Sequence, residues 1–150
     1  MGNLDVARRL IDDVRVAGAN EFCVCAGSRN SPLLAILGSS DARLFSFIDE
    51  RSATFFALGR VKLHGNPVAV VTTSGTAVAE MLPATIEAYY SGIPLILISA
   101  DRPARFRGTG APQSIEQVGL FGVYAETSLE SWTRTKPLHL NIEFDEPLLT

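Results

Sequence analysis

Glu50 is the residue in this sequence best placed for acid/base chemistry. It follows an apolar run, residues 44–48, and opens a segment, residues 50–59, that predicts a helix. A carboxyl group at the carboxyl end of a buried strand, beside aromatic side chains, can hold a proton near neutral pH because desolvation disfavours its charged form. The alternative is an ordinary first-turn carboxylate, stabilised by the positive end of the helix macrodipole. The residue alone leaves both interpretations open.

Arginine side chains follow two of the predicted strands. Arg29 and Arg102 lie at strand tips, and the loop after Arg102 carries two more arginines before it ends at Gln113. Guanidinium groups bind carboxylates through paired hydrogen bonds, so several of them in a chain of net charge −3 indicate a ligand with more than one carboxylate. The alternative is that Arg29 and Arg102 form structural ion pairs with Asp49 or Asp101.

The loop at residues 73–76 has the composition of a phosphate-binding loop but not its pattern. It contains no Lys and lacks the spacing of a Walker motif, so it is a weak candidate for binding nucleotide phosphates. Gly75 is better explained by a tight turn that lets a flat ligand ring approach the backbone.

The only two cysteines, Cys23 and Cys25, lie two residues apart in a predicted strand, which places both thiols on one face. No second pair completes a zinc site. We expect two reduced, buried core thiols; the alternative is a redox or metal role.

Length and composition predict one soluble domain. The chain has 150 residues, is 47% hydrophobic and 19% charged, and has no run of Lys or Arg, which makes nucleic acid and anionic membranes poor candidates as partners. Its apolar stretches are shorter than the roughly 18 residues that cross a bilayer. The residues near the amino terminus include acidic ones, unlike the basic and then apolar residues of a signal peptide. We therefore expect a cytoplasmic protein without membrane insertion.

Strands alternate with helices along the chain. Asn3 is a candidate cap for a first helix that ends at Gly18, and Pro83 predicts a kink or break in a helix at 77–90. The other predicted helices begin at Ser31 and at Glu50, and the strands are expected at 22–26, 44–48, 68–72 and 95–99. This alternation predicts an α/β fold: a doubly wound, mostly parallel sheet with helices on both faces.

Residues 129–142 break the pattern. Segments 129–132 and 138–142 both suggest strands, yet only residues 133–137 separate them, whereas a parallel crossover needs a dozen residues or more. Either the two segments pair antiparallel, or a helix is missing near 133–137.

In an open parallel sheet, ligands bind beyond the carboxyl ends of the strands. The unusual polar segments of this chain all follow strands, so we expect them to meet at one edge and to form one site. They are residues 27–31, 49–51, 73–76 and 101–103.

These segments resemble a known family when they are taken together. They are similar to the amino-terminal pyrimidine-binding domain of 2-succinyl-5-enolpyruvyl-6-hydroxy-3-cyclohexene-1-carboxylate synthases, the thiamine-diphosphate enzymes of menaquinone biosynthesis. The resemblance covers nearly the whole of residues 1–150 and includes the segment at 144–148. The segments that carry it are Gly27-Ser28-Arg29-Asn30-Ser31-Pro32, Asp49-Glu50-Arg51-Ser52-Ala53, Thr73-Ser74-Gly75-Thr76-Ala77 and Asp101-Arg102-Pro103.

The resemblance implies roles for six residues. Glu50 would be catalytic, hydrogen-bonding a ring nitrogen of the cofactor's aminopyrimidine, and Ser74 would also bind cofactor. The reaction implied is a transferase (carboligase) reaction: decarboxylation of 2-oxoglutarate and addition of the resulting carbanion to isochorismate, with the cofactor as electron sink. The residues implied in substrate binding are Ser28, Arg29, Arg102 and Gln113.

The resemblance also implies missing parts. The family holds Mg²⁺ and the diphosphate in a separate domain, supplied by a second subunit, so this chain contributes no metal ligand and is expected to be inactive alone, within a homodimer or homotetramer. The middle and diphosphate-binding domains are absent from residues 1–150. Two alternatives remain: the pyrimidine domain of another thiamine-diphosphate decarboxylase or an acetolactate synthase-like enzyme, against which the paired arginines argue, and a non-catalytic binding or assembly module.

Overall fold

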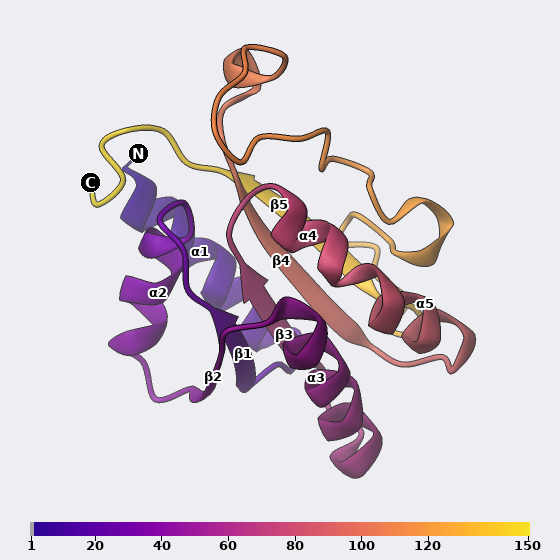
Figure 1. Ribbon diagram of the computed structural model, residues 1–150. Helices are drawn as coiled ribbons and strands as arrows, with labels where there is room; N and C mark the ends of the chain where they lie inside the picture. Colours follow the sequence, from indigo (N-terminus) through magenta and orange to yellow (C-terminus); the bar gives the residue numbers. More distant parts are fainter. Residues whose placement is uncertain (1) are drawn as a thin grey trace.

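The chain folds around one sheet of five parallel strands. A computed structural model describes residues 2–150 and gives the strand order β2-β1-β3-β4-β5 (Figure 1). Every neighbouring pair is parallel, so the carboxyl ends of all five strands lie at one edge. The strands are β1 (Glu21–Cys25), β2 (Arg43–Phe47), β3 (Val68–Thr72), β4 (Leu95–Asp101) and β5 (Leu138–Glu143).

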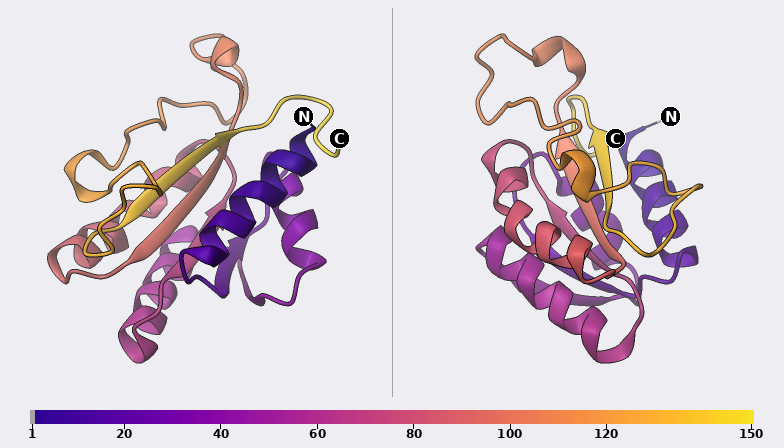
Figure 2. Two further views of the ribbon diagram at one scale, coloured as in Figure 1. Left: turned by 180° about the vertical axis from the view of Figure 1, so that it is seen from behind. Right: turned by 90° about the vertical axis from the view of Figure 1, so that its right-hand side faces the viewer.

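Helices cover both faces of the sheet, which confirms the predicted doubly wound α/β fold. Helices α1 and α2 pack together on one face, and α3, α4 and α5 pack on the other (Figure 2). Within residues 2–150, no helix is both long and apolar enough to cross a membrane. The helices are α1 (Asn3–Val16), α2 (Ser31–Gly38), α3 (Glu50–His64), α4 (Thr76–Glu80) and α5 (Leu82–Tyr90), with 3₁₀ turns η1 (Ala104–Phe106) and η2 (Gly122–Tyr124).

Strand β3 is the centre of the structure. It is fully buried, and because successive side chains point to opposite faces, it contributes to two separate cores. Ala69 and Val71 pack with α1 and α2, whereas Val68 and Val70 pack with α3 and its neighbours. This double coverage explains why the strand is a continuous apolar run in the sequence.

Two expectations about strands are wrong. Strand β2 is not buried but lies at the edge of the sheet, where Phe45 and Phe47 pack on Phe56 and the following Ile48 is fully exposed. Residues 129–132 form no strand, because Trp132 instead turns into the core and donates its indole N–H to the carbonyl of Lys136. The antiparallel pairing is therefore wrong as well.

The first helix begins differently from our expectation. Gly2, not Asn3, is the N-cap residue of α1. The side-chain amide of Asn3 instead donates to the carbonyls of Asp145, Pro147 and Leu148. The backbone amide of Leu4 donates to the carbonyl of Thr150 at 2.7 Å. The carboxyl-terminal segment is thus held against the start of α1, and the two ends of the chain lie side by side (Figure 1).

The helix predicted at 77–90 is interrupted, as Pro83 indicated. Helix α4 ends at Glu80, Met81 lies between the two helices, and Pro83 occupies the first turn of α5. Proline is tolerated there because its missing amide hydrogen would have had no partner in the helix. The interruption leaves α4 a short element directly after the loop at 73–75.

The two thiols should be inert in the folded chain. Cys23 and Cys25 are buried on the same face of β1, as predicted, and burial raises the pKa of each thiol to about 12. Because the thiolate is the nucleophile, we expect no reaction with a disulfide reagent near pH 8 until the chain is unfolded. Thiol titration with and without denaturant checks this; prompt labelling of either cysteine in the native state would contradict it.

Candidate active site

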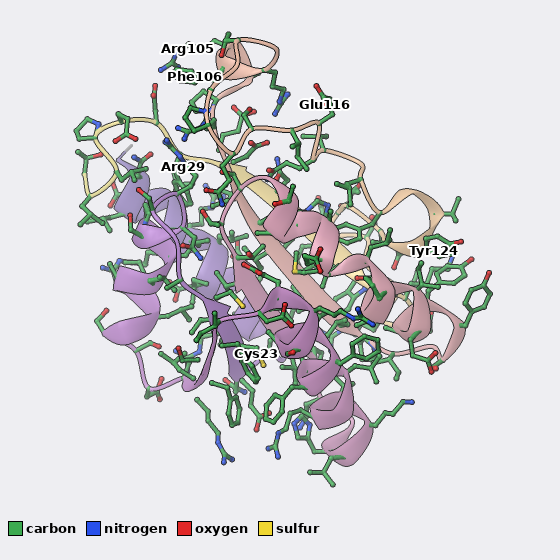
Figure 3. The ribbon with its side chains drawn as sticks, in the orientation of Figure 1. Cys23, Arg29, Arg105, Phe106, Glu116 and Tyr124 are labelled. Carbon is green, nitrogen blue, oxygen red and sulfur yellow. The ribbon has the colours of Figure 1, made fainter. Side chains whose placement is uncertain are left out.

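The predicted polar segments do meet at the carboxyl edge of the sheet. Figure 3 shows Arg29 at this edge, beside the carboxyl-terminal segment, while Arg105 and Phe106 lie at the tip of a loop that projects beyond the sheet. Hydrogen bonds described below join the loops after β3 and β4 and link Glu50 to the end of β3, while the loop after β1 is in close contact with Thr73. These segments, far apart in the sequence, therefore form one candidate site, as a parallel sheet allows.

Asp49 and Glu50 have separate roles. Asp49 is the N-cap of α3: its carboxylate accepts a hydrogen bond from the Ser52 amide at 2.7 Å, which lowers its pKa. Glu50 is half-buried and accepts a hydrogen bond at Oε1 from the Thr72 hydroxyl, 3.1 Å away at the end of β3. Asp49 serves as the helix cap, so the Glu50 carboxyl group is not needed there and instead faces the sheet edge.

The loop after β3 is packed too tightly for additional side-chain atoms. A Cβ on Gly27 would lie 2.5 Å from the Cβ of Thr73, and one on Gly75 would lie 2.7 Å from Gln113 Cγ. Gly75 also has φ 83° and ψ −146°, a backbone conformation essentially confined to glycine. The predicted tight turn at Gly75 is confirmed.

Gln113 and Ser74 bind each other reciprocally. The Ser74 hydroxyl donates to the Gln113 carbonyl at 2.9 Å, and the Gln113 side-chain amide donates to the Ser74 carbonyl at 3.0 Å. Arg102 is half-buried nearby and donates from Nε to the carbonyl of Pro112 at 3.1 Å. The structure thus brings Ser74, Arg102 and Gln113 into one cluster.

Arg29 and Ser28 differ in accessibility. Ser28 is exposed, whereas the Arg29 side chain is 6% exposed. Arg29 Nη1 donates to the Phe144 carbonyl at 2.9 Å and Nη2 lies 3.0 Å from the Glu146 carboxylate, while its buried Nε has no partner among the described residues. The sequence predicted a strand-tip ion pair with Asp49 or Asp101 as the alternative role for Arg29; its observed partner is instead Glu146.

Gln117 belongs to the candidate site but was not predicted from the sequence. It is fully buried, and its Oε1 accepts from the Gly75 amide at 2.9 Å. Its Nε2 donates to the Ala100 carbonyl at 3.0 Å and to Asn141 Oδ1 at 2.7 Å. The sequence did contain a related signal. Ser99, His139 and Asn141 are polar residues at inward-facing positions of mostly apolar strands, and buried polar groups of this kind need a polar partner such as Gln117.

The polar network continues from Asn141 to His139. Ser99 Oγ donates to Asn141 Oδ1 at 2.7 Å and lies 2.7 Å from His139 Nε2, so that Nε2 is the nitrogen that carries the proton. Asn141 Nδ2 donates to Asp101, which Arg107 also contacts. Burial lowers the pKa of His139 to about 4, so the imidazole is neutral at pH 7.

The fold is a domain of the doubly wound α/β class, a class that binds ligands at the carboxyl edge of its sheet, where the candidate site lies. A family model described as "Thiamine pyrophosphate enzyme, N-terminal TPP binding domain" matches residues 4–120. The chain therefore belongs to the thiamine pyrophosphate enzyme family and carries its N-terminal domain.

The more similar relatives share one name, which confirms the resemblance inferred from the sequence motifs. Proteins named 2-succinyl-5-enolpyruvyl-6-hydroxy-3-cyclohexene-1-carboxylate synthase from Bdellovibrio bacteriovorus and Akkermansia muciniphila are each 48% identical to the chain, over 99% and 93% of its length. One from Corynebacterium diphtheriae is 51% identical over 86% of the chain. The chain spans only 31%, 29% and 27% of these relatives, about a third of their length or less.

His139 predicts a pH dependence of stability. Its pKa is about 4 in the folded chain against 6.5 ordinarily, so the unfolded chain binds the additional proton first. We expect the free energy of unfolding to be highest above pH 6.5 and to fall by about 3 kcal/mol as pH drops from 6.5 to 4. Urea unfolding across this range measures it.

The matched variant is His139→Gln, which keeps a side-chain N–H toward Ser99 without a titrating group. Glu21, whose pKa its bidentate partner Arg60 lowers to about 2, contributes mainly below pH 4.5 and is unchanged in both proteins. The variant should lose most of the dependence between pH 6.5 and 4. Equal slopes for the two proteins would show that His139 is not the group responsible.

Proposed function

We propose that this chain is the pyrimidine-binding part of a thiamine-diphosphate-dependent transferase. The complete enzyme would decarboxylate 2-oxoglutarate and add the resulting four-carbon unit to isochorismate, in menaquinone biosynthesis. The single observation that carries the proposal is the position of Glu50, a half-buried carboxylate joined to the end of β3 beside the glycine-containing loop. The names of the relatives support the choice of reaction.

The residues at the sheet edge fit the pyrimidine end of the cofactor. Gly75 gives the third loop its tight turn, Ser74 is the adjacent polar residue, and Thr72 fixes one oxygen of Glu50. Glu50 Oε2 would then hold and exchange the proton at a ring nitrogen. When bound, thiamine diphosphate supplies an electron sink for the decarboxylation.

The substrate carboxylates would be bound by the cationic side of the same edge. Arg102 is half-buried and joined to the loop that ends at Gln113, and Ser28 is exposed beside the first loop. Arg29 is paired with Glu146, so its proposed part in substrate binding requires a substrate carboxylate to replace that partner. A dicarboxylate and a second acidic substrate suit this set of groups.

The rest of the enzyme would complete the cofactor site. Within residues 2–150 there is no group of three His, Cys, Asp or Glu side chains that could hold a metal ion. Mg²⁺ and the diphosphate would be held by the diphosphate-binding domain of a second subunit, so the chain alone would be inactive and the cytoplasmic enzyme a homodimer or homotetramer. Exposed apolar side chains in and directly after β2 and in α3 support a covering partner; they are Leu44, Ile48, Phe55 and Phe56.

A shortened connection before β5 is also part of the proposal. The alignment with the Bdellovibrio relative runs over 163 positions, more than the 150 residues of this chain, so that relative carries residues that this chain lacks. Strand β5 is the outermost strand of the sheet, so a helix near 133–137 would pack against it.

The first test is Glu50→Gln in the complete enzyme. The amide keeps the shape of the side chain but cannot exchange the proton, so we expect the turnover rate to fall by about 10² to 10⁴ with the fold intact. Initial rates with both substrates, alongside thermal unfolding, measure this. Activity within twofold of the parent enzyme would exclude the assigned role of Glu50.

The second test separates the two arginines. Arg102→Ala should raise the KM for the dicarboxylate about ten- to a hundredfold without loss of stability, because it removes a charge-assisted hydrogen bond to substrate. Arg29→Ala should raise KM as well, but should also destabilise the fold by about 1.5 to 3 kcal/mol because it leaves the buried Phe144 carbonyl unpaired.

The matched control is Arg105→Ala, which removes an exposed arginine paired with Asp145 and should leave both KM and stability near those of the parent. Steady-state kinetics with each substrate varied and with cofactor varied distinguish the possibilities. If Arg102→Ala weakened cofactor binding and spared the substrate KM, the substrate role of Arg102 would be wrong.

A further inference from the structure

Gln117 binds three strands at once. Its side-chain amide contacts the loop after β3 through Gly75, the end of β4 through the Ala100 carbonyl, and β5 through Asn141. Both of its amide hydrogens and its oxygen have partners, and the side chain is fully buried. A buried amide with every donor satisfied is a rigid connection, because each lost contact would leave a polar group unpaired.

The segment that carries Gln117 is itself anchored at both ends. Gln113 is joined to Ser74 by two hydrogen bonds, and Phe121 is 2% exposed and packs edge-on against His139, with ring centroids 4.7 Å apart. Between these anchors, residues 113–121 contain no regular helix or strand apart from turns. The position of Gln117 is thus set by tertiary contacts.

The Gly75 amide is the contact that matters for the site. Gly75 has a backbone conformation that only glycine adopts readily, and its carbonyl already accepts the Val78 amide of the next helix. The bond from its amide to Gln117 therefore fixes a turn that depends on glycine. Three residues earlier, Thr72 donates to Glu50, so the same loop also sets the partner of the proposed catalytic carboxyl group.

We propose that Gln117 is a positioning residue: it holds the loop at 72–75 in register with the ends of β4 and β5, and thereby holds the Thr72 partner of Glu50 in place. The role in catalysis rests on the proposed function, whereas the clamp on Gly75 does not. Gln117 acts through these neighbours and contacts no reacting atom itself.

Two substitutions separate the contacts. Gln117→Met keeps the length of the side chain but removes all three hydrogen bonds. Gln117→Glu keeps an oxygen that can accept from the Gly75 amide and removes the amide hydrogens that Ala100 and Asn141 accept. The control is Trp132→Phe, which removes a partly buried hydrogen bond to the Lys136 carbonyl, away from the loop.

The first readout is amide hydrogen exchange of residues 72–79 in the full-length protein, which needs no activity. We expect Gln117→Met to lose protection at the Gly75 amide, Gln117→Glu to keep it, and Trp132→Phe to match the parent. If the Gly75 amide were as protected in Gln117→Met as in the parent protein, the proposed clamp on Gly75 would be wrong.

The second readout is kcat/KM of the complete enzyme at a temperature where every variant is folded. We expect kcat/KM to fall about 10- to 100-fold in Gln117→Met and by less in Gln117→Glu. Trp132→Phe should stay within twofold of the parent enzyme although it loses about as much thermal stability as Gln117→Met. A Gln117→Met enzyme as active as the control would overturn the positioning role. Failure of the proposed function is recognised separately, by the Glu50→Gln enzyme remaining active.

Discussion

The central constraint on this structure is the lack of space at the carboxyl end of β3. That strand is covered by helices on both faces and by a strand on each side, so its following loop has to turn within a few ångströms of two other loops. Gly27 against Thr73, and Gly75 against Gln113, are contacts that no side chain could occupy without moving the backbone. Close packing of this kind converts three separate loops into one rigid edge.

Two adjacent carboxylates at this edge, Asp49 and Glu50, have different structural roles. Asp49 satisfies an amide at the start of α3, whereas Glu50, one residue later, points to the hydroxyl at the end of β3. The helix cap is a local requirement that any Asp, Asn or Ser could meet. The Glu50 contact is a tertiary one: it joins the start of α3, which follows β2, to the end of β3, on the other side of β1 in the sheet order.

Local chemistry made much of the fold predictable. The glycine at 75, the proline at 83 and the continuous apolar run at 68–72 each have one structural consequence that a sequence reader can state, and each is found. The failures came from information that is not local. The run at 44–48 is as apolar as a buried strand, but it has only one neighbouring strand, and Arg29 meets a carboxylate more than a hundred residues away.

The pairing of the two chain ends has a mechanical consequence. The segment at 144–150 is tied to the start of α1 through Asn3 and Leu4, and at its other end to Arg29 beneath the first loop. A displacement of Thr150 would therefore disturb the Leu4 backbone bond and the Asn3 side-chain bonds first, before it reached the Arg29 guanidinium. The start of α1 thus acts as a mechanical anchor between Thr150 and the carboxyl edge of the sheet.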